Sequence, residues 1–521
     1  MLLADTAVLA GSASPLWPED EVEWTLIAGK IHNLRLAARR LDGIVVPAGD
    51  VFSFWRQLGR ATRRRGYVQG RELREGCLVP STGGGLCQLS NAIYDTALRA
   101  GLQVVERHRH TQVVPGSLAE TDRDATVFWN YRDLRLRATQ AWRLEAELDA
   151  THLRIRIRGA AVDSAIRVPI ALTARKSVTI EDCAGCGESE CHRHVRELRA
   201  RVHRTWLVDE EWPELEAYRK RTLCDGDRVI RPAAPQGFHG RAIGLYARAL
   251  RRFHLGRGRP LPQARLGACR WLAQACSRQL QYTDTDLIVP QSLLPHLWAE
   301  GALAGRRFDV LMTALPMHEI QCQLDRAATR HPHSPTLRDF RADGALVDAE
   351  RMALARATHW ISPHARVLER AGERGLAVPW QLPQCIDVTV TQRRERWDPP
   401  RVFLAASTLA RKGAYELREA LQQLPIQLCL PPGAQETPAF WQGVSIRHVV
   451  SMAQGIRDAD VVVLPAWVEH QPRGLLQAMA LDKAVIATDA CGLPAGLPWI
   501  RVAEGSVAEL REAIGKALAL T

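Results

Sequence analysis

The spacing of hydrophobic residues changes along this 521-residue chain, and each spacing predicts a different kind of element. Apolar residues recur with helical periodicity over residues 24–45 and again from Leu86 to Ala97. From Leu153 to Arg158 (LRIRIR), apolar and basic residues alternate, which predicts an antiparallel sheet with one face in water. The first part of the chain is therefore expected to combine helices with antiparallel strands, an α+β arrangement.

Beyond about residue 205, short apolar runs alternate with longer helical stretches. This alternation predicts parallel sheets covered by helices, because parallel strands need long crossover connections. A second set of runs begins at Arg401, so we expect two successive Rossmann-like domains, whereas the composition of residues 320–343 favours a loop. The expected strands begin near Trp206, Arg228, Asp286, Phe308 and His359 in the first set, and near Arg401, Ile426, Asp460 and Ala484 in the second.

These patterns predict the α/β fold class in a multi-domain chain, and a hydrophobic content of 46% is ample for separate cores. We expect an α+β domain over residues 1–142 and a small β segment with clustered cysteines over 143–198. The two Rossmann-like domains are expected over 199–390 and 391–521. Each boundary is placed where the hydrophobic spacing changes.

Charge adds little to this picture. The chain has 69 Lys and Arg against 57 Asp and Glu, a net charge of +12, but its basic residues are scattered. Charge alone does not favour nucleic acid as a partner, while anionic small substrates are compatible with it. The N-terminus lacks the features of a signal peptide and no transmembrane span is evident, so we expect a cytoplasmic protein, with peripheral association with the cell envelope as an alternative.

A cysteine cluster is the first candidate site. Only three of the twelve cysteines cluster, which favours reduced thiols and one metal site over a disulfide framework. Cys183 and Cys186, two residues apart, would hold one ion across a tight turn, and Cys191 and His194 would complete a tetrahedral set, with His192 as the competing fourth ligand. Zinc is the expected ion; an iron–sulfur cluster or free surface thiols are the alternatives.

The Gly83-Gly-Gly-Leu-Cys-Gln turn is the second candidate site. Its three glycines permit backbone angles closed to other residues, so the chain can turn sharply into a helix that begins near Leu86. Cys87 then lies in the first helical turn. Unpaired N–H groups and the positive end of the helix dipole favour a thiolate there, which makes Cys87 a candidate nucleophile.

Histidines and carboxylates follow the cysteine along the chain. Residues 102–110 are expected to form a strand with Glu106, His108 and His110 on one face, followed by Asp124 and Asp133. The order cysteine, histidine, aspartate is that of transglutaminase-like thiol enzymes.

The hypothetical roles are therefore nucleophile for Cys87, base for His108 or His110, and orienting carboxylate for Asp124. Gln88 would be an oxyanion donor and Tyr94 a wall of the pocket. The alternative is a buried structural cysteine, with histidines that hydrogen-bond the glycine turn.

Three motifs resemble the VanW family: "FSFW…LG…T…RGY", "GGGLCQLSNAIYDTALRAGLQVVERHRHT" and "DATVFWNYRDLRLRA". The resemblance covers about residues 27–140. The family is named from vancomycin-resistance gene clusters, so the resemblance implies an association with antibiotic resistance and the cell envelope. It implies no defined reaction.

The second half resembles nucleotide-sugar glycosyltransferases of the two-domain GT-B architecture, retaining group. In "DADVVVLPAWVEHQPRGLLQAMALDKAVIATDACGLP", Glu469 matches the family's sugar-contacting glutamate, and Gln477 stands where a ribose-binding glutamate belongs. In "ASTLARKGAYELREAL", Lys412 matches the diphosphate-binding lysine. Ser407 occupies the position of the usual arginine, which the adjacent Arg411 could replace.

The resemblance implies an enzyme that transfers a sugar from a nucleotide-sugar donor to a cell-envelope or secondary-metabolite acceptor. A lysine suits this chemistry because a cation neutralises a leaving diphosphate, and a carboxylate can accept hydrogen bonds from sugar hydroxyls. Gln477 would bond a ribose hydroxyl more weakly than an ionised partner. Two alternatives stay open: a retired transferase fold that acts as a scaffold, and a Cys87-dependent enzyme of amide chemistry.

Overall fold

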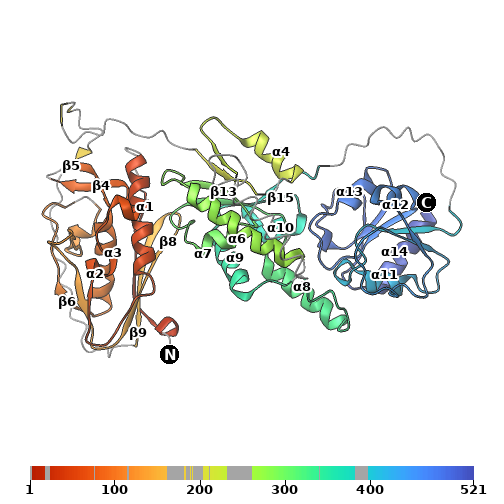
Figure 1. Cartoon of the computed structure of the whole chain (residues 1–521), viewed down its shortest axis with the longest axis horizontal. Helices are drawn as coiled ribbons and strands as arrows, with labels where there is room; N and C mark the ends of the chain where they lie inside the picture. Colours follow the sequence, from red (N-terminus) through yellow and green to blue (C-terminus); the bar gives the residue numbers. More distant parts are fainter. Residues whose placement is uncertain are drawn as a thin grey trace.

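The computed structural model describes residues 3–17, 24–74, 77–113, 116–160, 181–182, 188, 190–191, 203–209, 212–231, 261–339, 341–381 and 397–520. Within them the chain forms three bodies arranged along its long axis (Figure 1). The N-terminal body contains residues up to about 160, and the middle and C-terminal bodies each surround one parallel sheet. The predicted multi-domain α/β class is confirmed at this level.

Antiparallel strands form the main sheet of the N-terminal body. The sheet order is β1-β9-β8-β2, and buried and half-buried residues alternate along β8 and β9, as the sequence predicts. Leu144 and Ile155 face the core, while Arg158 and Glu145 form an ion pair of 2.7 Å on the other face. The strands are β1 (Val8–Pro15), β2 (Val45–Val46), β8 (Trp142–Leu148) and β9 (His152–Gly159).

Two long helices complete this body. Apolar side chains of α1 and α3 pack with those of β8 and β9 in one core. Two further three-stranded sheets, β10-β5-β4 and β3-β7-β6, flank it. The remaining elements are α1 (Trp24–Leu41), β3 (Val51–Ser53), α2 (Phe54–Leu58), β4 (Gln69–Arg74), β5 (Cys77–Thr82), α3 (Leu86–Arg99), β6 (Gln103–Glu106), β7 (Arg135–Arg137) and β10 (Glu181–Asp182), with 3₁₀ turns η1 (Leu3–Asp5), η2 (Arg63–Arg65) and η3 (Leu118–Thr121).

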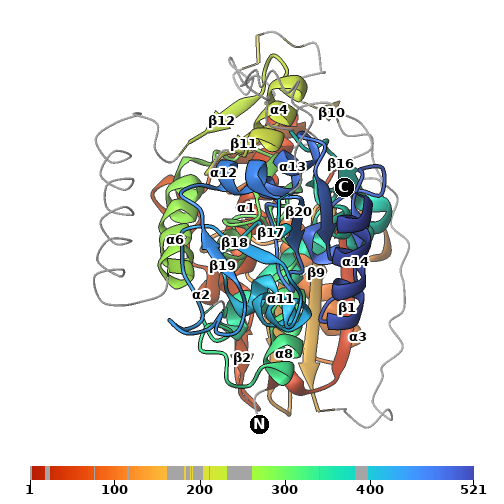
Figure 2. The ribbon, with the colours of Figure 1, turned by 90° about the vertical axis from the view of Figure 1, so that its right-hand side faces the viewer.

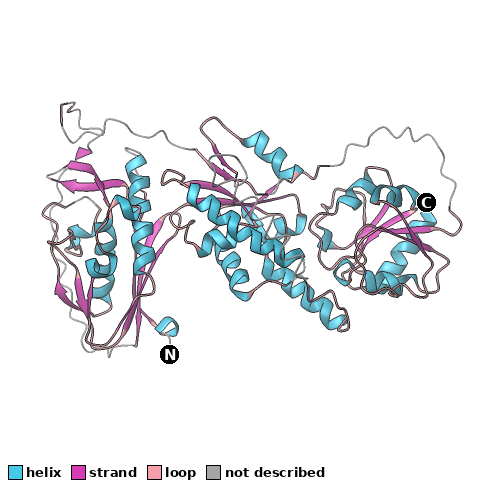
Figure 3. Cartoon of the chain, in the orientation of Figure 1, coloured by secondary structure: helices cyan, strands magenta, loops and turns pink. Residues whose placement is uncertain are grey.

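The middle body contains a parallel sheet of order β12-β11-β13-β14-β15-β16 with helices on its faces (Figure 3). The five strands expected from the first set are all present. Residues 320–330 lie in helix α8, so the loop prediction for 320–343 is wrong in this part. The elements are β11 (Thr205–Leu207), α4 (Pro213–Thr222), β12 (Arg228–Ile230), α6 (Leu261–Gln279), β13 (Asp286–Pro290), α7 (Leu294–Ala299), β14 (Arg307–Leu311), α8 (Met317–Arg330), α9 (Gly344–Arg356), β15 (Trp360–Ser362), α10 (Ala365–Ala371), η5 (Gly372–Arg374) and β16 (Gly375–Ala377).

The C-terminal body repeats this plan around a parallel sheet of order β19-β18-β17-β20-β21-β22, which faces the viewer in Figure 2. Two successive Rossmann-like units are thus confirmed. The elements are β17 (Arg401–Leu404), η6 (Ala410–Lys412), α11 (Ala414–Leu421), β18 (Gln427–Leu430), β19 (Ile446–His448), α12 (Met452–Asp458), β20 (Val461–Leu464), α13 (Arg473–Met479), β21 (Ala484–Ala487), η7 (Asp489–Cys491), β22 (Ile500–Arg501) and α14 (Val507–Leu520).

The middle body contacts its neighbours at opposite ends of its strands. Arg35 of α1 donates a hydrogen bond to the carbonyl of Ala304, just before β14 begins. At the carboxyl ends of the strands, His364 follows β15, and its Nε2 lies 3.2 Å from the carbonyl oxygen of Glu469, beyond the end of β20. The carboxyl ends of the two parallel sheets therefore face each other, and these are the ends where open α/β sheets bind ligands.

No helix in the described part of the chain is both long and apolar enough to cross a lipid bilayer.

Candidate functional sites

The glycine turn before α3 is built as the sequence predicts. Gly83 and Gly85 have φ of +84° and +100°, angles that favour glycine. A Cβ on Gly84 would lie 2.4 Å from the carbonyl oxygen of Gly70, so the turn packs against β4 with no room for a side chain. The helix begins at Leu86 and holds Cys87, half-buried, in its first turn.

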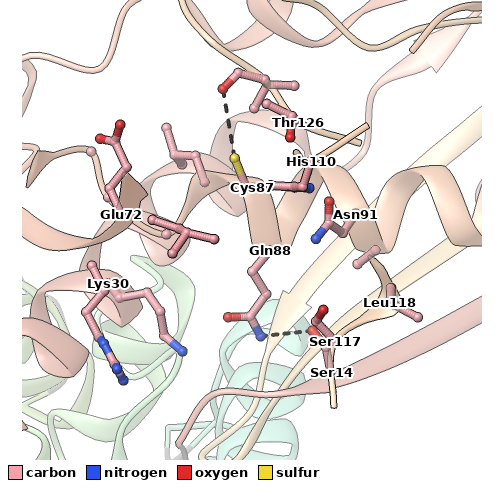
Figure 4. A pocket seen from close by; sticks show the side chains of 18 of the residues that line it. Ser14, Lys30, Glu72, Cys87, Gln88, Asn91, His110, Ser117, Leu118 and Thr126 are labelled. Atoms are coloured by element: carbon pink, nitrogen blue, oxygen red, sulfur yellow. Dashed lines mark hydrogen bonds between the residues drawn. The ribbon is translucent and has the colours of Figure 1, made fainter. Parts of the chain in front are cut away.

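The structure brings Cys87, His110 and Asp124 together. His110 Nδ1 lies 2.6 Å from Asp124 Oδ2, and the His110 backbone N–H donates to the same oxygen at 2.7 Å. Arg107 binds the other carboxylate oxygen of the buried Asp124 at 2.8 Å. With Nδ1 engaged, Nε2 is the ring nitrogen left for the thiol, and Figure 4 shows His110 beside Cys87.

The pair His110–Asp124 carries opposite charges at neutral pH. Burial alone would lower the pKa of His110, but hydrogen bonds to the Asp124 and Cys87 side chains raise it to about 9. Burial would raise the pKa of Asp124, yet the hydrogen bonds from His110 lower it to about 2. An imidazolium therefore stands next to the thiol.

His108, the other predicted base, does not join this group. Its Nε2 lies 3.1 Å from Glu106 Oε1, and its side chain is 39% exposed. Asp133 instead accepts hydrogen bonds from Ser53 Oγ at 2.6 Å and from the Trp55 backbone at 3.1 Å. The expected strand over residues 102–110 ends at Glu106, and the chain then leaves the sheet.

The side chains of Gln88 and Tyr94 do not face Cys87 as an oxyanion donor and a pocket wall would. Gln88 Nε2 donates to Ser14 Oγ at 3.0 Å and to the Pro15 carbonyl at 2.7 Å, which directs the amide toward β1 (Figure 4). Tyr94 is buried, with the Arg107 guanidinium 5.0 Å from its ring centre. Tyr94 therefore supports Arg107, and through it the Asp124 carboxylate.

Cys87 opens into a groove of about 1550 Å³. The groove runs between β1, the β4–β5 hairpin and the segment that follows His110. Lys30, Asn91 and Thr126, which the sequence did not single out, lie on its wall with Cys87 and His110. No local pattern marks these three residues, because only the fold brings α1, α3 and the later segment to one surface.

The second candidate site lies where β17 and β20 end. Lys412 Nζ lies 2.9 Å from Glu469 Oε2 and donates to the Val468 carbonyl at 2.9 Å. Gly413, with φ of +77°, lets the two loops meet, since a Cβ there would lie 2.0 Å from the carbonyl oxygen of Pro465. The structure therefore brings together two residues that the sequence predicts to share a donor site.

Glu469 is an ionised carboxylate in this arrangement. Burial alone would raise its pKa, but the Lys412 ammonium and backbone N–H groups lower it to about 2. These N–H groups belong to His470 and Gln471, each 2.8 Å from Glu469 Oε1. Burial, together with the nearby Lys412 charge, lowers the pKa of His470 to about 3, so the only charged pair of this loop in the described chain is Lys412–Glu469.

The other predicted donor residues surround this pair less closely. The backbone carbonyl of Arg411 accepts hydrogen bonds from the N–H groups of Trp467 and Val468, and burial lowers the pKa of the Arg411 guanidinium. Ser407 and Gln477 are half-buried, on the loop after β17 and on α13. His364, which the sequence did not select, holds the loop from the middle body; its position directly after a predicted strand could have indicated it.

The predicted metal ligands cannot be placed as a set. Cys183, Cys186 and His194, and the competing His192, lie outside the described residues, and Cys191 is half-buried. Among the residues that the structure does describe, no three His, Cys, Asp or Glu side chains form a metal-binding group. The zinc and iron–sulfur alternatives stay predictions.

Two family models match the chain. The model described as "VanW like protein" matches residues 29–158, and the one described as "Glycosyl transferases group 1" matches residues 402–519. The chain thus carries a VanW domain on its N-terminal side and a group 1 glycosyltransferase domain on its C-terminal side. The resemblances to the VanW family and to glycosyltransferases are confirmed, whereas the retaining group stays a prediction.

Curated relatives match a short part of the chain. The "Uncharacterized protein YoaR" of Bacillus subtilis (strain 168) is 40% identical over 104 residues, 20% of this chain and 34% of that protein. The "Vancomycin B-type resistance protein VanW" of Enterococcus faecalis is 34% identical over 111 residues, 21% of this chain and 40% of that protein. The chain therefore spans well under half of the length of these relatives.

Among solved structures, sucrose-phosphate synthase from Thermosynechococcus elongatus is similar at 17% identity and a TM-score of 0.38, covering 57% of this chain and 75% of that one. The UDP-forming α,α-trehalose-phosphate synthase from Burkholderia xenovorans, in complex with glucose-6-phosphate, is similar at 14% identity and a TM-score of 0.32, covering 50% and 71%. The structural similarity is partial in both cases, and the two parallel sheets define the fold of this chain.

Proposed function

We propose that the middle and C-terminal bodies form a glycosyltransferase that moves a sugar from a nucleoside-diphosphate donor to a cell-envelope or secondary-metabolite acceptor. The observation that carries this proposal is the buried Lys412–Glu469 pair at the carboxyl ends of β17 and β20. These ends face the middle body, and the pair belongs to a domain that matches group 1 glycosyltransferases. A cation and a carboxylate at this edge suit a donor with a diphosphate and a sugar.

The reaction needs charge neutralisation where the diphosphate leaves. The bond from sugar C1 to the diphosphate oxygen breaks, a bond from C1 to the acceptor oxygen forms, and the proton of the acceptor hydroxyl passes to the leaving diphosphate. Lys412, with Arg411 beside it, would neutralise the leaving diphosphate, and Glu469 would accept hydrogen bonds from sugar hydroxyls. Because the segment around Glu469 resembles the retaining group, we propose transfer with retention of configuration.

Nucleotide binding tests this function directly. We expect one of UDP, GDP or ADP to raise the Tm of the full chain, and Lys412→Ala to weaken its affinity about tenfold or more, because a charged hydrogen bond is lost. Lys516→Ala is the matched control, since Lys516 pairs with Glu512 at 2.6 Å on the exposed face of α14.

Glu469→Gln separates the two roles of the pair. This variant should keep affinity for the bare nucleotide and lose the additional affinity for the nucleotide sugar. If no nucleotide or nucleotide sugar stabilises the wild-type chain, the transferase proposal is wrong and the scaffold alternative takes its place.

A further inference from the structure

The groove of the N-terminal body contains chemistry that sugar transfer does not use. Its wall holds Cys87 with an imidazolium, His110, which is in turn oriented by the buried Asp124. This is the arrangement of an activated thiol: the nucleophile, a proton donor and acceptor beside it, and a third group that fixes the ring. An imidazolium stabilises a neighbouring thiolate, and the start of α3 adds the positive end of a helix.

Polar groups also converge in front of the sulfur. Asn91 lies one helical turn beyond Cys87, and its Oδ1 accepts the Ala125 N–H at 2.8 Å, which fixes the amide so that its NH₂ is the end left for the groove. Thr126 Oγ1 is buried without a hydrogen-bond partner among the described residues. Figure 4 shows His110, Asn91 and Thr126 grouped on one side of Cys87. Donors in this place could stabilise an oxyanion that forms at a carbonyl attacked by the thiolate.

The charge of the groove selects the substrate. Burial and the neighbouring Arg71 charge lower the pKa of Lys30 to about 8, so an anion that binds there would restore its full protonation. The acidic Asp95 is neutralised by Arg99, 3.1 Å away. Basic residues outnumber acidic ones on the wall, with Lys30, Arg60, Arg71, Arg99 and Arg132 against Glu72 and Asp95.

We propose that Cys87, His110 and Asp124 form a second active site, which cleaves or transfers the acyl group of a carboxylate-bearing peptide amide bound in this groove. Cys87 Sγ attacks the amide carbonyl, the C–N bond breaks, and His110 gives its proton to the leaving amine. Water or an acceptor amine then attacks the thioester, His110 takes the proton, the C–S bond breaks, and the acid or the new amide leaves with the Cys87 thiolate and the His110 imidazolium restored. Asn91 positions the oxyanion, and Lys30 binds the substrate carboxylate.

Thiol reactivity tests the nucleophile. The full chain is treated with iodoacetamide at pH 7, and the modified cysteines are identified by peptide mass spectrometry. Cys224 and Cys322 are exposed, so they serve as reference thiols within the same protein. We expect Cys87 to react at least about tenfold faster than both, although it is half-buried, because His110 and the start of α3 lie beside its sulfur.

Two histidine variants form the matched pair. His110→Asn should lower the alkylation rate of Cys87 to that of the reference thiols. His108→Asn, two residues away and paired with Glu106, should leave the faster rate unchanged. Equal rates at Cys87, Cys224 and Cys322, or equal effects of the two variants, would contradict the proposal. Near-ultraviolet circular dichroism of each variant shows whether the fold is retained, and a variant that fails this check is replaced by His110→Gln.

Substrate class is tested with succinyl-Ala-Ala p-nitroanilide, which carries a carboxylate, and with neutral acetyl-Ala-Ala p-nitroanilide. We expect p-nitroaniline release, a Cys87 thioester in the intact mass, and at least about tenfold higher kcat/KM for the succinyl compound, as suits a charge-assisted contact.

Lys30→Met should remove the preference for the succinyl compound over the acetyl compound. Lys220→Ala, which changes an exposed lysine of α4, should keep this preference. In the Cys87→Ser variant, the thioester should be missing from the intact mass. Release that is unaffected by Cys87→Ser, or no release from either compound, would overturn the acyl-transfer proposal. Nucleotide binding at Lys412 is unaffected by these variants, so the two proposals fail independently.

Discussion

At the scale of single residues, His110 links the thiol of Cys87 to the carboxylate of Asp124, and it also links the site to stability. Its folded-state pKa of about 9 lies above the ordinary value near 6.5, so folding takes up a proton on this ring. The stabilisation is fully present below pH 6.5 and is lost as the pH rises through about 9. The lowered pKa of Asp124 acts in the acid range, where its contribution disappears only as the pH falls through about 2.

His110→Asn should therefore destabilise the chain most at pH 5 to 6, by about 2 kcal/mol, and little above pH 9. Thermal unfolding of wild type and variant across this pH range measures the difference. A difference in Tm that does not change with pH would show that His110 is not charged in the folded chain. His108→Asn, measured in parallel, should show no comparable pH dependence.

At the scale of elements, the turn before α3 determines where the thiol lies. Gly84→Ala should destabilise the N-terminal body by about 1–3 kcal/mol, because the added Cβ would meet the Gly70 carbonyl and the strand must shift. Gly344→Ala is the control: this glycine opens α9 with no atom near the position of a Cβ, so alanine should be neutral or stabilise by up to about 1 kcal/mol. Urea unfolding of both variants checks the pair, and equal effects would contradict the packing argument.

The elements also show where sequence analysis succeeds. The start of α3 could be predicted because glycine freedom and helical periodicity are local properties of residues 83–97. The strand predicted over 102–110 runs four residues past its real end at Glu106, since Arg107 leaves the sheet to bind Asp122 and Asp124, which is a tertiary effect. Helix α8 could have been found, because its buried Ile320, Leu324 and Ala327 recur at helical spacing within the polar stretch.

The functional sites, too, could be predicted only where a local pattern or a resemblance marks their residues. Lys412 and Glu469 were found through a resemblance, and Cys87, His110 and Asp124 through their order along the chain. Lys30 and Asn91 carry no signal of their own. Lys30 belongs to an ordinary amphipathic helix, and it becomes part of a site only when α1 packs beside the glycine turn, where its side chain lies against Gly85.

At the scale of the whole molecule, several ion pairs join the middle and C-terminal bodies, and the pair of Glu214 with Arg473 is one of them. Glu214 of α4 is buried and pairs with Arg473, the first residue of α13, at 2.5 Å through both guanidinium nitrogens. Gln381 donates to the same carboxylate at 3.0 Å. Breaking a buried pair leaves an uncompensated charge, which costs about 3–5 kcal/mol.

Arg473→Met should therefore loosen the contact between the middle and C-terminal bodies. We expect a lower Tm and a thermal transition that splits into two in calorimetry. Arg447→Ala is the control, because Arg447 forms an exposed pair with Asp458 within the C-terminal body. A single unchanged transition in Arg473→Met would show that the remaining contacts suffice, which include the Arg366–Glu504 pair and the packing of Trp467 and Val468 with the middle core.

The middle body meets the VanW domain at the amino ends of its strands and the group 1 glycosyltransferase domain at their carboxyl ends, which bears on how the two proposed sites would work together. In the described part of the chain, the middle body lies between Cys87 and Lys412, so we expect a small product released at Cys87 to reach Lys412 through solvent. Fusion in one chain therefore fixes the ratio of the two sites at one to one and keeps both near the same partner. An acceptor that served both proposed sites at once would have to reach both ends of the middle body.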